Sequence, residues 1–201
     1  MSIGTCTSYE GQVVNYITPD FFDGFGLQVS AMKDLEGQTA AGDVDSALSA
    51  ALTYSRTADN DVTYSASLGV DAALSVNGGV PAGTPLPVTV QGGASVGWEG
   101  WTLAAAGQYE LASLAGGNSW GTGIGVSKDV TDQLTVGTEL ALDHYEDTGV
   151  GFRELSLGTT AEFKLTDNAS IDGAFNVLHR TGDDGTDEVS ASVGTGLSVS
   201  F

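Results

Sequence analysis

Long stretches of strict two-residue alternation constrain the fold of this 201-residue chain more than any other feature. From Val189 to Phe201, Val, Ala, Thr, Leu and Phe occupy every second position, and Ser and Gly fill the positions between them. The stretch from Val62 to Val76 repeats the pattern. Successive side chains of a strand point to opposite faces, so a period of two indicates β-strands rather than helices. Both stretches exceed the roughly 5 to 6 residues that are usual for strands of globular sheets.

Turn signals divide the chain into eleven expected strands. Their predicted ranges are 9–18, 24–32, 46–56, 61–76, 88–98, 101–111, 119–129, 134–145, 152–165, 169–180 and 187–201. Short turns, such as Glu99-Gly100, alternate with longer connections, such as Lys33 to Asp45, Asn77 to Pro87 and Thr181 to Asp187. Long alternating strands with short turns at one end and longer loops at the other are typical of bacterial outer-membrane barrels. The sequence therefore predicts an all-β, antiparallel, up-and-down transmembrane β-barrel.

Composition excludes several other classes of protein. Six Lys and Arg against 26 Asp and Glu give a net charge of −20, which disfavours nucleic acid as a partner. The single cysteine, Cys6, cannot form an internal disulfide, and no zinc-ligand pattern or other metal site is evident. No apolar run reaches 18 residues, so no transmembrane helix is expected, and the first residues do not read as an export signal. We expect no cofactor.

Aromatic residues cluster near the short turns, where a membrane barrel meets water at one interface. The predicted aromatic girdle consists of Tyr16, Phe25, Tyr54, Tyr64, Trp98, Trp101, Phe163 and Phe201. A thinner second girdle is expected near the longer loops, from Tyr109, Trp120, Tyr145 and Phe152. A soluble core would instead concentrate its rings at strand centres, where burial is greatest.

The polar positions between the apolar ones predict a water-filled lumen, because a sheet that spans lipid must close and turn its apolar side outward. The charged residues expected to face the lumen are Asp71, Glu99, Glu110, Glu139, Asp143, Glu154, Glu162, Lys164, Asp172 and Arg180. Only two of these residues are basic, so the wall is expected to favour cations.

The segment Val13 to Phe25, which reads VVNYITPDFFDGF, resembles a strand-turn-strand unit of Gram-negative general porins. The shared elements are Tyr16, then Thr18-Pro19, an aromatic residue, and Gly24-Phe25. A final strand that ends in Phe201 is similar to the family's C-terminal assembly signal. In sixteen-stranded porins this segment lies at about the sixth strand. The resemblance thus implies that residues 1–201 are a single domain, a partial or open barrel of about eleven strands that is the C-terminal part of a larger barrel.

The same resemblance implies a passive diffusion channel for small hydrophilic solutes and ions in the outer membrane of a Gram-negative bacterium. It also implies outer-membrane lipid and lipopolysaccharide as partners, and a homotrimer. The narrowing loop of these porins cannot be mapped onto the sequence, so no site residue is carried over from the family. The acidic stretch Asp183 to Glu188 prompts a further hypothesis, divalent cations bridging loops to lipopolysaccharide phosphates, although its spacing is not that of an EF-hand.

Three alternatives remain open at this stage. The chain could be a translocation or structural barrel of the autotransporter kind, or a soluble β-sandwich adhesin. An enzyme would have to use His144 or His179 with a neighbouring acid such as Asp143, but adjacent strand residues point to opposite faces. No nucleophile elbow, H-E-x-x-H or P-loop motif occurs. We therefore expect no enzymatic activity.

Overall fold

The computed structural model of the chain describes residues 12–18, 21–33, 44–76, 86–112, 119–147 and 149–199. Eleven strands in these ranges form one antiparallel sheet whose spatial order is the order of the chain, β1 to β11. The strands are β1 (Gln12–Ile17), β2 (Phe25–Lys33), β3 (Val44–Thr57), β4 (Thr63–Val76), β5 (Val88–Trp98), β6 (Trp101–Ala112), β7 (Ser119–Asp129), β8 (Leu134–Asp147), β9 (Val150–Thr166), β10 (Ala169–Gly182) and β11 (Asp187–Val199). The predicted all-β, up-and-down architecture is confirmed.

The predicted strand boundaries agree with the observed ones to within a few residues, and residues 9–11, 200 and 201 lie outside the described part. The largest difference is between β8 and β9, where Glu146 pairs with Gly151 and Asp147 with Val150. Cross-strand pairing thus continues through a polar, glycine-containing stretch that the sequence suggests to be a loop. The connection at this point spans residues 148–149 rather than the predicted 146–151.

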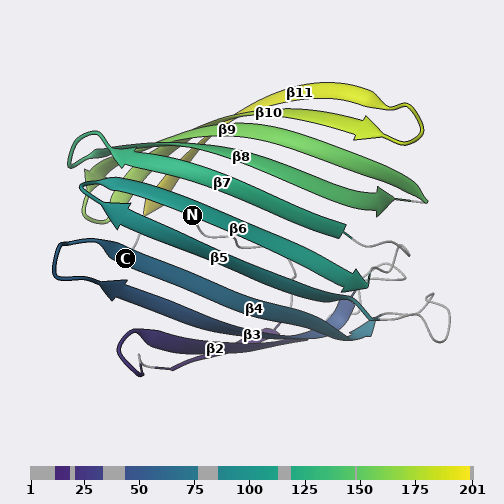
Figure 1. Cartoon of the computed structure of the whole chain (residues 1–201), viewed down its shortest axis with the longest axis horizontal. Helices are drawn as coiled ribbons and strands as arrows, with labels where there is room; N and C mark the ends of the chain where they lie inside the picture. The colour runs from purple at the N-terminus through teal and green to yellow at the C-terminus, as the bar shows by residue number, and fades with distance from the viewer. Residues whose placement is uncertain are drawn as a thin grey trace.

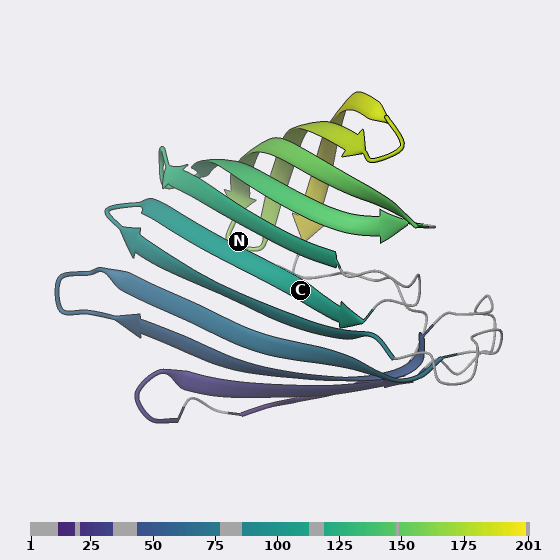
Figure 2. The same ribbon diagram turned by 45° about the vertical axis from the view of Figure 1, so that its right-hand side comes forward.

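Each strand lies beside the strands that precede and follow it in sequence. The sheet is curved, most visibly at β9 to β11 (Figures 1 and 2). β1 and β11 are the two ends of the strand order, and no described residue pairs one with the other. The sheet is therefore a curved, open wall. A β-sandwich requires two sheets packed face to face, whereas the described strands form one.

The pairing register gives the sheet two chemically different faces. Gln28, Ser49, Asp71 and Gln91 lie on the same face of the sheet. The other side chains on this face are mainly polar or small, and we call it the inner face. The opposite, outer face is mainly aliphatic and aromatic. Among the described residues no hydrophobic side chain is buried, and outer-face residues such as Leu68 remain more than half exposed, at 60%. The apolar side of this sheet thus faces outward instead of forming a core.

Two short turns depend on left-handed backbone. Gly24 precedes β2 with φ of 107°, and a Cβ at this position would collide with the backbone oxygen of Ser55. Glu99 and Gly100 connect β5 to β6 with φ of 47° and 74°, as in the two-residue turns that match the twist of a hairpin. Glu99 therefore lies in a turn at the end of the sheet and not on a strand, which corrects its predicted place on the wall.

Candidate pore-lining surface

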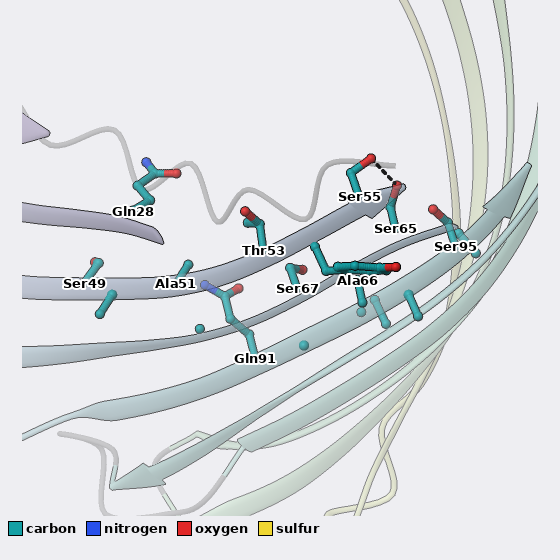
Figure 3. A pocket seen from close by; sticks show the side chains of 18 of the residues that line it. Gln28, Ser49, Ala51, Thr53, Ser55, Ser65, Ala66, Ser67, Gln91 and Ser95 are labelled. Atoms are coloured by element: carbon teal, nitrogen blue, oxygen red, sulfur yellow. Dashed lines mark hydrogen bonds between the residues drawn. The ribbon is translucent and has the colours of Figure 1, made fainter. Parts of the chain in front are cut away.

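The inner face of β2 to β6 forms a groove of about 670 Å³ lined by small polar side chains (Figure 3). The lining includes Gln28, Ser49, Ala51, Thr53, Ser55, Ser65, Ser67, Asp71, Gln91 and Ser95. Asp71 is the charged residue of this lining, and its Oδ2 accepts a hydrogen bond from Nε2 of Gln91 at 2.7 Å. This half of the inner face is therefore rich in hydroxyl groups and carries little charge.

The cross-strand register places nine of the ten predicted charged residues on the inner face, on five different strands. These nine are Asp71, Glu110, Glu139, Asp143, Glu154, Glu162, Lys164, Asp172 and Arg180. Three of them are neighbours in one row, because Asp143 pairs with Glu154 and Glu154 with Arg180. Glu162 and Asp172 form a second adjacent pair, and the other four stand apart. Most of the charge therefore lies on β8 to β10.

The carboxylates of β8 have room because glycines face them on neighbouring strands. A Cβ at Gly158 would lie 3.1 Å from Cγ of Glu139, so that side chain packs directly against the glycine backbone. The same construction at Gly121 would collide with the carboxylate of Asp143. On β6 and β7, Oγ of Ser119 donates a 2.7 Å hydrogen bond to Glu110. Glycine at these inner positions thus lets the acids lie flat against the wall.

Arg180 and Glu154 form the salt bridge with the least exposed partners in the described part of the chain. Nε of Arg180 donates to Oε1 of Glu154 at 2.5 Å, and the hydroxyl of Tyr145 donates to the same oxygen at 2.8 Å. The guanidinium carbon lies 6.0 Å from the ring centroids of both Tyr145 and Phe152. These four side chains come from three adjacent strands, β8, β9 and β10.

Tyr145 and Phe152 correct the sequence-based prediction of a second outer girdle. They are direct cross-strand partners on the inner face, with ring centroids 5.5 Å apart and ring planes 24° apart. The alternation could have revealed this, because Tyr145 lies two residues from Asp143 and Phe152 two residues from Glu154 on the same strands. Proximity to a loop shows how close an aromatic ring lies to the end of its strand. Only its odd or even position along the strand shows which face of the sheet it lies on.

The remaining aromatic predictions that lie within the described ranges fall on the outer face. Six of the eight girdle residues lie on strands next to the short turns and a seventh, Tyr16, lies near the end of β1, while Phe201 is outside the described part. The rings of Phe25 and Tyr54 pack with centroids 4.8 Å apart, and Nζ of Lys128 lies 5.2 Å from the Trp101 ring. Near the longer connections, Tyr109 and Trp120 are cross-strand partners, also on the outer face.

The histidines do not form a catalytic arrangement with the inner acids. His144 lies beside Trp120 on the outer face. Asp143 lies on the inner face, so the two side chains are on different sides of the sheet, as the alternation predicts. His179 pairs with Asp187 at 2.7 Å. No group of three or more His, Cys, Asp or Glu residues in the described ranges is placed to hold a metal ion. Within the same ranges there is no helix with the length and apolar character needed to cross a bilayer.

Electrostatic tuning outside the strands is found in the turn between β10 and β11. The backbone N–H of Thr186 donates to Oδ1 of Asp184 at 2.9 Å. Hydrogen bonds from the side chain and the backbone of Thr186 hold the pKa of Asp184 below its usual range. Asp184 in this turn is therefore more readily ionised than an ordinary aspartate.

A curved, up-and-down antiparallel sheet with a polar inner face and an exposed apolar outer face is the arrangement found in walls of outer-membrane β-barrels, the class to which porins belong. Among solved structures, the chain is similar to an anion-selective porin from Comamonas acidovorans, with a TM-score of 0.60 at 19% sequence identity. The similarity covers 93% of this chain and 57% of that porin, so the chain spans little more than half of its length. No protein-family model matches the sequence, and the search of curated proteins found no match. At this identity the likeness concerns the fold.

Proposed function

We propose that this chain forms the wall of a passive diffusion channel for small hydrophilic solutes and ions in the outer membrane of a Gram-negative bacterium. The observation that carries the proposal is the pairing of a polar, curved inner face with an outer face of exposed aliphatic side chains and no buried hydrophobic core among the described residues. Such an outer face is costly in water and stable in hydrocarbon. Lipid is therefore the solvent that this surface fits.

The position of the aromatic residues supports the same orientation in a membrane. Ring-bearing residues gather near the short turns, while the outer strand centres carry mainly aliphatic side chains such as Leu68 and Leu157. Aromatic rings favour the boundary between lipid and water, where an apolar body and a polar edge are both satisfied. We propose that the outer girdle residues mark one membrane interface.

We further propose that the channel favours cations. Of the nine predicted charged residues that lie on the inner face, seven are carboxylates, and only Lys164 and Arg180 are basic. A water-filled space with such a wall raises the local concentration of cations. The structurally similar porin is described as anion-selective, so the proposed charge preference differs from the one in its name.

We also propose partners for this chain. Outer-membrane lipid and lipopolysaccharide fit the apolar outer face, and a homotrimer is implied by the resemblance to general porins. The divalent-cation hypothesis for the acidic loops stays a prediction, tested by the melting temperature with and without added Ca²⁺. A porin-type wall serves passage rather than chemistry, so we do not propose an enzymatic role.

Planar-bilayer recordings of the refolded chain test both parts of the proposal. We expect discrete conductance steps, and a reversal potential in asymmetric KCl that indicates preference for K⁺. A protein that is folded in detergent yet gives no steps would contradict the channel. Steps with a Cl⁻-selective reversal potential would leave the channel standing and contradict the cation preference.

A further inference from the structure

One row of inner-face residues on β8 to β11 differs from the rest in carrying a base among acids. The register aligns Asp143, Glu154, Arg180 and Glu188 on adjacent strands β8, β9, β10 and β11. Arg180 is thus flanked by a carboxylate on each side. Within the described residues, the only other basic side chain on the inner face is that of Lys164, near the opposite end of β9.

The contacts of Arg180 hold its side chain against Glu154 and leave it the more exposed of the two. The side chain of Glu154 is 15% exposed, whereas that of Arg180 is 38% exposed, so the guanidinium is the more accessible member of the pair. Glu154 is also held from β8 by the Tyr145 hydroxyl. The two rings of Tyr145 and Phe152 lie at equal distance, 6.0 Å, from the guanidinium carbon. Hydrogen bonding and cation–π attraction together restrain a side chain that would otherwise be flexible.

We propose that Arg180 is a selectivity-determining residue of the channel, because it covers Glu154 and lowers the negative potential of the wall at this level. The inference rests on the proposed channel function and deepens it. A unit charge acting across about 10 Å of water at about 0.1 M salt changes the local concentrations of cations and anions by about 1.3-fold each in opposite directions, so their ratio changes by roughly twofold, which is measurable.

Reversal potentials of charge variants in asymmetric KCl test this role. Arg180→Gln should raise the K⁺/Cl⁻ permeability ratio by about twofold, and Glu154→Gln should lower it by about the same factor. The double variant should return near wild type, because it removes one charge of each sign. Tyr145→Phe should stay near wild type, because it removes a hydrogen bond without changing charge. An unchanged ratio in Arg180→Gln, or a shift of all variants in one direction, would overturn the proposal.

A matched control removes the same charge on the other face of the wall. Arg153 is adjacent to Glu154 in sequence, and its exposed side chain lies on the outer face. Arg153→Gln should leave the permeability ratio unchanged, and an equal effect would show that the measurement reports net charge alone. If Arg180→Gln does not fold, the double variant is compared with Glu154→Gln, where the loss of Arg180 should again raise the ratio about twofold. Absence of conductance in wild type would refute the channel, whereas conductance insensitive to Arg180 would refute only this inference.

Discussion

Single residues matter most where the backbone leaves the strand conformation. Gly24 combines a φ of 107° with a close approach to the Ser55 carbonyl, and Ser55 N–H donates to the Gly24 oxygen at 2.8 Å. The end of β3 is thereby attached to the turn before β2. A side chain here would meet rigid backbone rather than a flexible side-chain tip.

We expect Gly24→Ala to destabilise the folded protein by about 1–3 kcal/mol, because alanine is strained at this φ and its Cβ would collide with the backbone. The measurement is the unfolding midpoint in detergent, followed by β-sheet circular dichroism. Gly194→Ala is the control, since a Cβ at this β11 position meets no atom within 4 Å. Equal stability of the two variants would show that the turn is not restrained as described.

At the scale of the strand, alternation decides which solvent each side chain meets. On β9, Leu157 is 52% exposed on the outer face, while its neighbour Ser156 is on the inner face in the row of Ala141 and Leu178. Both residues lie near the middle of the longest strand, which has 17 residues. Two adjacent positions therefore offer a direct comparison of the faces.

Leu157→Arg should weaken folding into lipid vesicles by about 2–4 kcal/mol, the cost of a charge on the lipid side near the bilayer midplane. Ser156→Arg should fold with little loss, because its side chain is expected to reach water in the lumen. Denaturant titration of each variant in vesicles of defined lipid gives the two free energies. The membrane orientation would be contradicted if the inner-face arginine were the more damaging one.

At the scale of the whole molecule, the charges on the described inner face are unevenly distributed over the sheet. The inner face of β2 to β6 is lined mainly by hydroxyls and small residues, whereas most inner charges lie on β8 to β10. In the proposed channel, an ion would therefore meet one side of the wall with few charges and another with many. The preference for cations is expected to arise from the charged side and to act through water.

A preference that acts through water should weaken as salt screens it. The Debye length falls from about 10 Å at 0.1 M to about 3 Å at 1 M salt, so the K⁺/Cl⁻ ratio should decline over this range. Reversal potentials at a fixed concentration gradient, repeated at increasing mean KCl, give the dependence. A ratio that stays constant would point instead to direct contact of ions with the wall.

The sequence by itself determined the number of strands, their boundaries to within a few residues, the short turns and the two chemical faces. It could do so because strand parity is local: each side chain points opposite to its neighbour wherever the chain is extended. Parity also predicted that Asp143 and His144 cannot share a site. The resemblance at Val13 to Phe25 pointed to the same porin class that the solved structure supports as a fold.

Only the tertiary structure decided which residues of different strands become neighbours. The pairing register made Arg180 a neighbour of both Glu154 and Glu188, and paired Tyr145 with Phe152. Register depends on turn geometry and on hydrogen bonds summed along whole strand pairs, and a shift of two residues keeps every face while changing every partner. A count of charges along the sequence therefore gives the acidity of the wall, but not which of its charges are paired.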